Sequence, residues 1–461
     1  MTNTHAAVSA PAVSRMLGRL EKSGLCMHGF ALMRDGLTAA EGYWAPLRAG
    51  VPHRMFSVSK SMTSLAVGLL KADGKLKLTD SICDYFPDKL PKTVPGPLLR
   101  LTIRDMLRMA SCHRFTTYKL ANDEDWTRSY FTHPPTHEPG TVFCYDTSSS
   151  HTLAALAERL SGMPLLRFLQ TRLFDIIGAS DDKRWLTDPM GVSQGGTGLV
   201  LSLRDLAKVA QFCLRMGEGT ALEPYLQEAT LKQIDTPLQD YAEQTFGYGY
   251  QFWRMRNNSF AMYGMGGQLA LCLPDLQTVF CTIADTQLEL DDLQKICDAF
   301  WQEVYPGLFG ETRSPQGEWD ALEEKINALS MRAVENNDTF AGAYGREYAF
   351  DFSPLDLRLL CLYKRELVYE NASGRHTLPF GVGSWAASTF PALEEPCVTS
   401  AGWIAPQLFR LTSYMVGDRP CGVDMLLSFA GDRVTVQMKS VRELHMAKYG
   451  GVASGTAAGR R

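Results

Sequence analysis

The spacing of the hydrophobic residues changes near residue 245, and this change limits the fold more than any other feature of the sequence. Before it, apolar residues in 11–22 and 56–72 recur at intervals of three and four, as in helices, and Asp35-Gly36 marks a β-hairpin. After it, segments between 245 and 284 alternate like strands, and a wide helical stripe returns over 291–304. We therefore expect an α+β fold, in which an antiparallel sheet is flanked by N- and C-terminal helices and carries a helical insertion.

The last third of the chain has a different pattern and predicts a separate domain. Proline, glycine and charged residues gather over 306–320, and from 339 to 446 short β-like segments alternate with turns. We expect an α+β domain over 1–308, a linker with a connecting helix over 309–335, and a β-rich accessory domain over 336–461. The glycine-rich tail of this last domain is expected to be disordered.

Charge balance and cysteine spacing argue against several kinds of partner. The 461 residues carry 46 Lys and Arg against 50 Asp and Glu, a net charge of −4, so a nucleic-acid partner is not expected. The N-terminus lacks a secretory signal pattern, and no run approaches the roughly 18 apolar residues that span a bilayer, so we expect a cytoplasmic protein without a membrane partner. The 11 cysteines form no CxxC pair, and two prolines separate His133 from His137, so no metal site is expected.

A serine and a lysine stand three residues apart where the helix of 56–72 begins. Ser57 and Lys60 therefore share one face of its first turn. A serine hydroxyl needs an adjacent base to act as a nucleophile, and a partly desolvated lysine can be that base. The unpaired N–H groups of a helix N-terminus can stabilise negative charge on a carbonyl oxygen. The structural alternative is that Ser57 is an N-cap beside a solvated lysine.

Two other segments match serine-hydrolase patterns by spacing alone. Ser180 and Lys183 repeat the S-x-x-K spacing, but no apolar helix begins there, so we interpret this match as chance. Gly191-Val-Ser193-Gln-Gly195 fits the nucleophile elbow of an α/β-hydrolase, which needs a buried strand before it and a helix after it. A proline precedes this motif and glycines follow it, so an α/β-hydrolase-type esterase using Ser193 is the less favoured enzyme.

Three motifs in a defined order place Ser57 in a wider context. They are Phe56-Ser-Val-Ser-Lys60, Glu138-Pro-Gly-Thr-Val-Phe-Cys-Tyr145-Asp-Thr147 and Tyr263-Gly-Met-Gly-Gly-Gln268. Together they resemble the serine β-lactamase and penicillin-binding-protein-like hydrolases, in particular the branch of class C β-lactamases, esterases and 6-aminohexanoate-dimer hydrolases. The resemblance covers about residues 10–305 and implies a β-lactamase/transpeptidase-like fold for the α+β domain.

The resemblance implies catalytic roles for two residues of the first motif and one of the second. Ser57 would be the acylated nucleophile and Lys60 its base. Tyr145 would relay a proton to the leaving group, for which cations such as Lys60 must lower the pKa of the phenol well below its usual value.

The third motif is implied to bind the substrate. Met265, Gly266 and Gly267 match a strand motif, K-T-G or H-x-G, whose glycines let the substrate approach the backbone closely. The N–H of Gln268, with that of the nucleophile, would form the oxyanion hole.

Two residues depart from the family pattern. Thr147 stands where the family has asparagine, and Met265 stands where it has lysine or histidine. These changes remove a polar amide contact and a cation that binds carboxylates, which argues against β-lactam or D-Ala-D-Ala recognition. We therefore expect a pocket that favours neutral substrates.

The sequence thus predicts a serine hydrolase that cleaves a small ester or amide through an acyl-enzyme on Ser57. No cofactor is expected, because this chemistry needs only proton transfer and an oxyanion hole. The alternative is a catalytically silent β-lactamase-like module for ligand binding or assembly, and a homo-oligomer is left open. The site is expected between the strand of 263–268 and the segment 112–147. Aromatic residues expected along its walls are Trp126, Tyr130, Phe131 and Tyr248.

Overall fold

The fold is described from a computed structural model of the chain. It covers residues 7–121, 124–287, 291–310, 314–338, 340–391, 393–440 and 449–458. The chain divides into two units, Met1–Ala284 with Asp291–Leu329, and Asp285–Leu290 with Ser330–Arg461. Within the described ranges, no helix has both the length and the apolar character needed to span a bilayer.

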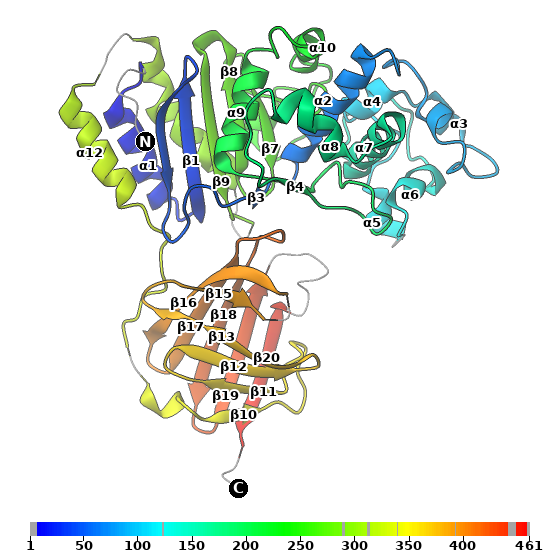
Figure 1. Cartoon of the computed structure of the whole chain (residues 1–461). Helices are drawn as coiled ribbons and strands as arrows, with labels where there is room; N and C mark the ends of the chain where they lie inside the picture. Colours follow the sequence, from blue (N-terminus) through cyan, green and yellow to red (C-terminus); the bar gives the residue numbers. More distant parts are fainter. Residues whose placement is uncertain are drawn as a thin grey trace. The chain divides into compact units, whose positions relative to one another are not determined.

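A six-stranded antiparallel sheet forms the centre of the first unit (Figure 1). Its order is β2-β1-β9-β8-β7-β6, so the N-terminal hairpin is completed by strands from much later in the chain. Both faces are covered, because Val279 and Cys281 join the core that includes α9 (Leu203–Leu214), whereas Phe280 between them stacks on Phe300 of α11 (Asp292–Glu303). The strands are β1 Met27–Arg34, β2 Leu37–Tyr43, β6 Trp253–Arg254, β7 Phe260–Gly264, β8 Gln268–Leu273 and β9 Thr278–Ala284.

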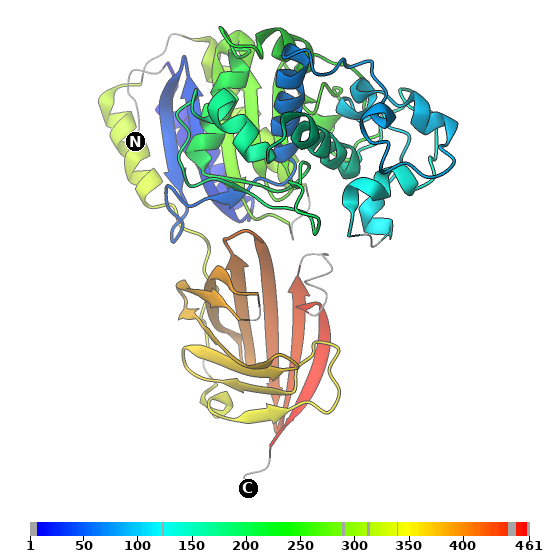
Figure 2. The same ribbon diagram turned by 45° about the vertical axis from the view of Figure 1, so that its right-hand side comes forward.

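The helical insertion occupies the chain between β2 and β6 and packs beside the sheet (Figure 2). Its central helix is α2 (Val58–Ala72), which contacts α7 (Thr147–Ser161) and also β7. Every residue of α2 from Val58 to Leu70 is buried, which explains its apolar sequence. The other helices of the insertion are α3 Gly96–Arg100, α4 Ile103–Leu107, α5 Thr117–Ala121, α6 Trp126–Thr132, α8 Leu165–Leu169 and α10 Glu223–Ala229.

Two further helices and a small sheet complete the first unit. Helix α1 (Ala10–Lys22) packs against α11 and α12 (Gln316–Asn327), and α12 also contacts β2. The connecting helix expected within 309–335 is therefore part of the first unit. A three-stranded sheet in the order β3-β5-β4 lies within the insertion. Its strands are β3 His53–Arg54, β4 Arg184–Trp185 and β5 Leu199–Leu201.

The second unit is a β structure that curls into a nearly closed barrel (Figure 1). Its main order is β13-β12-β11-β10-β20-β19-β18-β17-β16-β14, with β15 paired to β16, and β13 at one end of this order contacts β15. The strands are β10 Glu347–Ala349, β11 Leu359–Leu362, β12 Glu366–Asn371, β13 Gly374–Pro379, β14 Gly381–Val382, β15 Ala386–Phe390, β16 Glu395–Ala405, β17 Leu408–Met415, β18 Cys421–Ala430, β19 Arg433–Ser440 and β20 Gly451–Ala457. The predicted α+β fold with a β-rich C-terminal part is confirmed.

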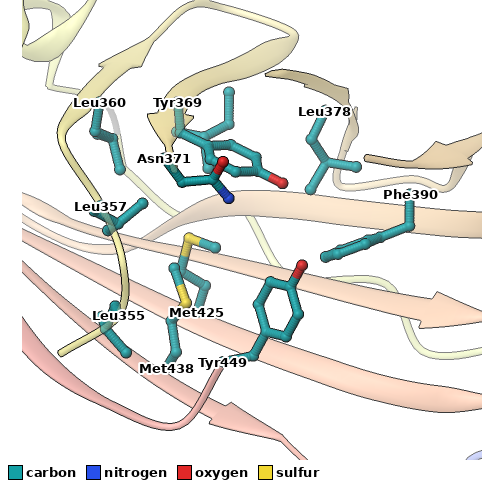
Figure 3. A pocket seen from close by; sticks show the side chains of 11 residues that line it. Leu355, Leu357, Leu360, Tyr369, Asn371, Leu378, Phe390, Met425, Met438 and Tyr449 are labelled. Atoms are coloured by element: carbon teal, nitrogen blue, oxygen red, sulfur yellow. The ribbon is translucent and has the colours of Figure 1, made fainter. Parts of the chain in front are cut away.

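The interior of the barrel is apolar apart from a few buried polar groups. Eleven residues line a small cavity there, and the hydroxyl groups of Tyr369 and Tyr449 both point into it (Figure 3). The cavity volume is about 10 Å³, which corresponds to a single water molecule. The remaining lining residues are Leu355, Leu357, Leu360, Leu367, Asn371, Leu378, Phe390, Met425 and Met438.

The C-terminal tail differs from the expectation of disorder. Residues Gly451–Ala457 form β20, which pairs with β19 along one edge and with β10 along the other. Small residues dominate this strand, and its backbone hydrogen bonds on both sides hold it in place, which a search for apolar alternation does not detect. The last three residues, 459–461, lie outside the described ranges.

The packing of α2 gives a test of the fold around Ser57. A Cβ atom at Gly68 would lie 2.5 Å from a ring carbon of Tyr225, and the Tyr225 hydroxyl is held 2.7 Å from Ser64 Oγ. Overpacking costs about 1–3 kcal/mol, whereas alanine gains about 1 kcal/mol over glycine in helix propensity. We expect Gly68→Ala to lower the midpoint of thermal unfolding.

Gly317→Ala in α12 is the matched control, because no atom lies within 4 Å of a Cβ at that position. This variant should unfold at or slightly above the wild-type temperature. A Gly68→Ala protein that is as stable as Gly317→Ala would contradict the close contact between α2 and Tyr225.

Candidate active site

Ser57 lies where the chain turns sharply from the small sheet into α2. The strand β3 pairs with β5, and the Met55 N–H donates to the Leu199 carbonyl at 2.7 Å. Phe56 then adopts a left-handed conformation with φ of 45°, which costs about 1–3 kcal/mol and is typical of functional sites. Ser57 occupies the N-cap position, but its side chain makes no capping hydrogen bond. Its hydroxyl is therefore available to other partners.

The amino group of Lys60 is buried beside Ser57 and faces three oxygen atoms. Lys60 is 1% exposed, so the structural alternative of a solvated lysine is wrong. Its Nζ lies 3.1 Å from Ser57 Oγ, 3.2 Å from Thr147 Oγ1 and 2.9 Å from the Gly196 carbonyl oxygen. A neutral amine has two N–H donors and one lone pair. With both donors used by Gly196 and Thr147, the lone pair faces the Ser57 hydroxyl.

The protonation of Lys60 suits this arrangement. Burial lowers the pKa of Lys60 to about 7, because the ammonium ion loses its hydration. The buried carboxylate of Asp146 raises this pKa and the ammonium group of Lys119 lowers it, both by smaller amounts. Near pH 7 roughly half of the Lys60 amine is therefore uncharged and able to accept a proton.

Tyr145 contacts both members of this pair. Its phenol lies close enough to the Ser57 side chain for that group to act on the phenol pKa, and its ring centroid lies 5.0 Å from Lys60 Nζ. The ring stacks on Trp253 at 5.7 Å and meets Tyr248 edge-on at 6.4 Å, which fixes its orientation. Burial raises the pKa of Tyr145, so the expectation of a lowered phenol pKa is wrong. A phenol that keeps its proton can donate to the Ser57 oxygen.

The third motif forms a turn and not a strand. β7 ends at Gly264 and β8 begins at Gln268, and these two residues pair across the hairpin. Gly266 and Gly267 between them have φ angles of 80° and 87°, which glycine adopts without strain. The side chain of Met265 at the turn is 42% exposed, and the Gln268 side chain is buried and donates to the Ala284 carbonyl at 2.6 Å. Only the backbone of Gln268 is left for an oxyanion role.

This hairpin lies directly against the backbone at Ser57. A Cβ atom at Gly264 would be 2.1 Å from the Met55 carbonyl oxygen and 3.0 Å from the Ser57 nitrogen. Only glycine permits this distance, so the Tyr-Gly pair of the motif has a packing reason as well as a sequence match. The structure thus brings the three predicted motifs together at one place.

Gly196 is a site residue that the sequence analysis did not identify. Its carbonyl accepts from Lys60, and a Cβ on it would lie 2.5 Å from Thr147 Cγ2. A Cβ on the preceding Gly195 would lie 2.6 Å from the Ser150 carbonyl oxygen of α7. The paired glycines therefore let this loop pass close to α7. In the sequence these residues are marked only by the glycine-rich run Gly195-Gly196-Thr-Gly198. This run contains no acidic, basic or aromatic side chain that would indicate a catalytic role.

The two motifs that match serine-hydrolase patterns by spacing alone, at Ser180 and Ser193, do not have the geometry of a catalytic site. The Ser193 segment lies in a loop before β5, without the strand–turn–helix of a nucleophile elbow, and its N–H donates to Glu158 at 3.3 Å. Lys183 Nζ donates to the backbone carbonyl of Ser180, whose hydroxyl is bound by Asp205. In the described ranges no group of three or more His, Cys, Asp or Glu residues could hold a metal ion.

Most of the aromatic residues expected as walls belong to the core. Tyr130 and Phe131 are fully buried in the main hydrophobic cluster. Trp126 stacks on Tyr118 with ring centroids 4.0 Å apart. Tyr248 is also buried, and it alone of the four packs on the Tyr145 ring. Most of these aromatic residues of the helical insertion therefore pack within the protein and do not contact the reacting groups.

The segment that leads into α5 brings positive charge to the site. The Thr147 N–H donates to Thr116 Oγ1 at 3.3 Å, and the Thr117 N–H donates to Ser148 Oγ at 3.1 Å, so α5 is attached to the start of α7. Three exposed residues lie on this segment and in α5, namely Arg114, Phe115 and Lys119. We call these three residues the cationic lip. The expectation of neutral substrates rested on Met265 alone and did not include these cations.

Comparisons with known proteins relate the chain to a family of hydrolases. Residues 25–294 match the family model described as Beta-lactamase. A 6-aminohexanoate-dimer hydrolase of Paenarthrobacter ureafaciens is 26% identical over 215 residues, which are 43% of this chain and 54% of that protein. The match thus spans about half the length of this relative.

Solved structures share the fold at low sequence identity. The octameric penicillin-binding protein homologue from Pyrococcus abyssi superimposes with a TM-score of 0.53 at 13% identity, covering 92% of this chain and 97% of that one. EstCE1, a hydrolase with promiscuous acyltransferase activity, has a TM-score of 0.52 at 17% identity, covering 63% of this chain and 98% of its own.

Thr147 gives a direct test of how Lys60 is oriented. Thr147→Val removes the oxygen that accepts from Lys60 Nζ and leaves a buried N–H without an acceptor, which costs about 1–3 kcal/mol. We expect the rate at which a fluorophosphonate labels Ser57 to fall about tenfold. Thr147→Ser keeps the hydroxyl and should label within about twofold of the wild type. Equal labelling rates for the two variants would show that Thr147 does not orient the amine.

Proposed function

This chain belongs to the β-lactamase family, and we propose that it is a serine hydrolase that cleaves a small ester or amide through an acyl-enzyme on Ser57. The family resemblance drawn from the sequence motifs is confirmed by the match over residues 25–294. The observation that carries the proposal is the 3.1 Å contact between Ser57 Oγ and a buried Lys60 whose other two oxygen contacts leave its lone pair for the serine.

In the proposed acylation, Lys60 takes the proton of Ser57 as the serine oxygen attacks the substrate carbonyl carbon. The negative charge that develops on the carbonyl oxygen is stabilised by the N–H groups of Ser57 and Gln268. The leaving group then departs with a proton donated by Tyr145, and the Lys60 ammonium passes the proton it took from Ser57 to the phenolate beside it, so that both groups return to their starting states. At the end of this step the acyl group of the substrate is bound to Ser57 Oγ as an ester.

Deacylation runs the same proton transfers with water in place of the leaving group. Lys60, again neutral, accepts a proton from the water that attacks the acyl carbon. The bond to Ser57 Oγ breaks, and the proton returns to this oxygen. No metal or organic cofactor takes part, because each step is a proton transfer or an attack at the carbonyl carbon.

The substrate class is proposed from chemistry and from relatives. The relative from Paenarthrobacter ureafaciens is a hydrolase of 6-aminohexanoate dimers, and EstCE1 is a hydrolase with acyltransferase activity. Thr147 and Met265 replace the asparagine and the cation that the family uses for β-lactam and D-Ala-D-Ala substrates, so we propose a simpler ester or amide. A homo-oligomer and residence in the cytoplasm stay predictions.

The proposed hydrolase and the alternative, a catalytically silent ligand-binding or assembly module, predict different outcomes when the protein is treated with a fluorophosphonate. A fluorophosphonate that labels Ser57 stoichiometrically supports the hydrolase. Label on Ser193 would support the α/β-hydrolase-type esterase, although its loop lacks the elbow. Absence of label at both serines would support a ligand-binding or assembly module.

The proposed mechanism predicts that Ser57→Ala abolishes hydrolysis. A screen of p-nitrophenyl esters, D- and L-amino-acid amides and a chromogenic cephalosporin should find activity in the wild type, with at least a thousandfold loss in Ser57→Ala, because the nucleophile is gone. Ser193→Ala is the matched control and should keep full activity. Activity that survives in Ser57→Ala would end the proposal.

The pKa of Lys60 predicts the pH dependence. Since the amine must be uncharged to accept the serine proton, kcat/KM for a neutral ester should rise with pH and level off above a pKa of about 7. Asp146 raises the Lys60 pKa, so Asp146→Asn, which can still cap α7, should move the inflection to lower pH. A profile that falls between pH 6 and 8, or an inflection that moves upward in Asp146→Asn, contradicts Lys60 as the base.

A further inference from the structure

The cationic lip carries two positive charges that form no ion pair with any acidic group in the described ranges. Among the described residues, neither Arg114 nor Lys119 forms an ion pair. Two acidic side chains near the lip and the site are already engaged. Asp125 pairs with Lys89 at 2.5 Å, and the Asp146 carboxylate accepts from Ser148 and Ser149 at the start of α7. Unpaired cations beside a buried site attract anionic ligands.

The lip is held close to the reacting groups by a short chain of contacts. The Lys119 N–H donates to the Thr116 carbonyl at 3.2 Å, and Thr116 Oγ1 accepts from the Thr147 N–H. Thr147 Oγ1 in turn is 3.2 Å from Lys60 Nζ. The charge of Lys119 acts on Lys60, which places the two amines within electrostatic reach of each other.

The buried residues of α5 determine which side of this helix carries Lys119. Thr117 and Tyr118 are buried, with Thr117 Oγ1 2.9 Å from Ser129 Oγ and Tyr118 stacked on Trp126. Lys119 therefore lies on the opposite, exposed side of the turn. Arg114 lies over the ring of Phe115 at 5.2 Å, and its charge also acts on Cys144, the neighbour of Tyr145. Both cations thus belong to the wall that carries Tyr145 and Thr147.

We propose that Lys119, with Arg114 beside it, binds a carboxylate of the substrate, so that the enzyme prefers esters or amides that carry a negative charge near the scissile bond. This inference rests on the proposed hydrolase function. In this inference Lys119 of α5 takes over the carboxylate-binding role of the lysine or histidine that Met265 replaces on the hairpin. The site would then select anionic substrates through side chains of the segment 114–119.

The test compares matched substrates on matched variants. The first pair is p-nitrophenyl butyrate and mono-p-nitrophenyl glutarate, which differ by a carboxylate on the acyl chain. The second pair is methyl 4-acetoxybenzoate and 4-acetoxybenzoate, which differ by a carboxylate on the leaving group. The variants are Lys119→Met, which keeps side-chain length, Lys119→Arg, which keeps charge, and Lys22→Met at the exposed end of α1 as the control. Rates are measured at pH 8.5, where Lys60 is uncharged in each variant.

We expect the wild type to prefer the anionic member of at least one pair. In Lys119→Met, kcat/KM for that member should fall about fivefold through KM, with the neutral member within twofold. Lys119→Arg and Lys22→Met should keep the wild-type ratio. Adding salt should lower the preference of the wild type but not that of Lys119→Met.

Two results would overturn the inference. One is an anionic-to-neutral ratio that is the same in Lys119→Met and in the wild type. The other is an equal change in Lys22→Met, which would indicate net charge and not position. Either result leaves the proposed function intact as long as neutral ester hydrolysis still requires Ser57. Loss of that requirement would instead refute the function itself.

Discussion

The burial of one amino group constrains the whole site. An ammonium ion at the position of Lys60 would lose its hydration, so the amine is held partly neutral and needs acceptors for its two hydrogen atoms. Those acceptors come from the loop carrying Gly196 and from the first residue of α7. When both hydrogen atoms are donated to these acceptors, the remaining lone pair can accept the proton of Ser57. The position of α2 between β7 and α7 follows from this requirement as much as from its apolar surface.

Backbone atoms supply much of the geometry around this amine. The loop at Gly195-Gly196 and the end of β7 at Gly264 approach α7 and Met55 so closely that a Cβ at any of these positions would overlap its neighbour. The left-handed Phe56 stores strain at the same point. Tyr145 is fixed by aromatic packing against Trp253 and Tyr248 rather than by charge, which is why it retains its proton.

The features that the sequence predicted well are local or periodic. The Asp35-Gly36 hairpin, with both residues at positive φ, the α2 stripe and the Ser57–Lys60 spacing follow from short-range rules. The features that it missed depend on distant partners. β20 exists because β10 and β19 flank it, and the raised pKa of Tyr145 reflects burial that spacing does not reveal. The same holds for Gly196 and Lys119, whose roles arise only when α5, α7 and the loop before β5 meet.

The division of labour between backbone and side chains has a consequence for how such an enzyme can diversify. The groups that contact the amine, and those proposed to bind the oxyanion, are in large part peptide atoms, which no point substitution deletes. The exposed side chains of Arg114, Phe115 and Lys119 lie on a single short stretch, in which only Thr117 and Tyr118 between them are buried. Selection for a new substrate can therefore act on that stretch while the reaction centre is inherited unchanged.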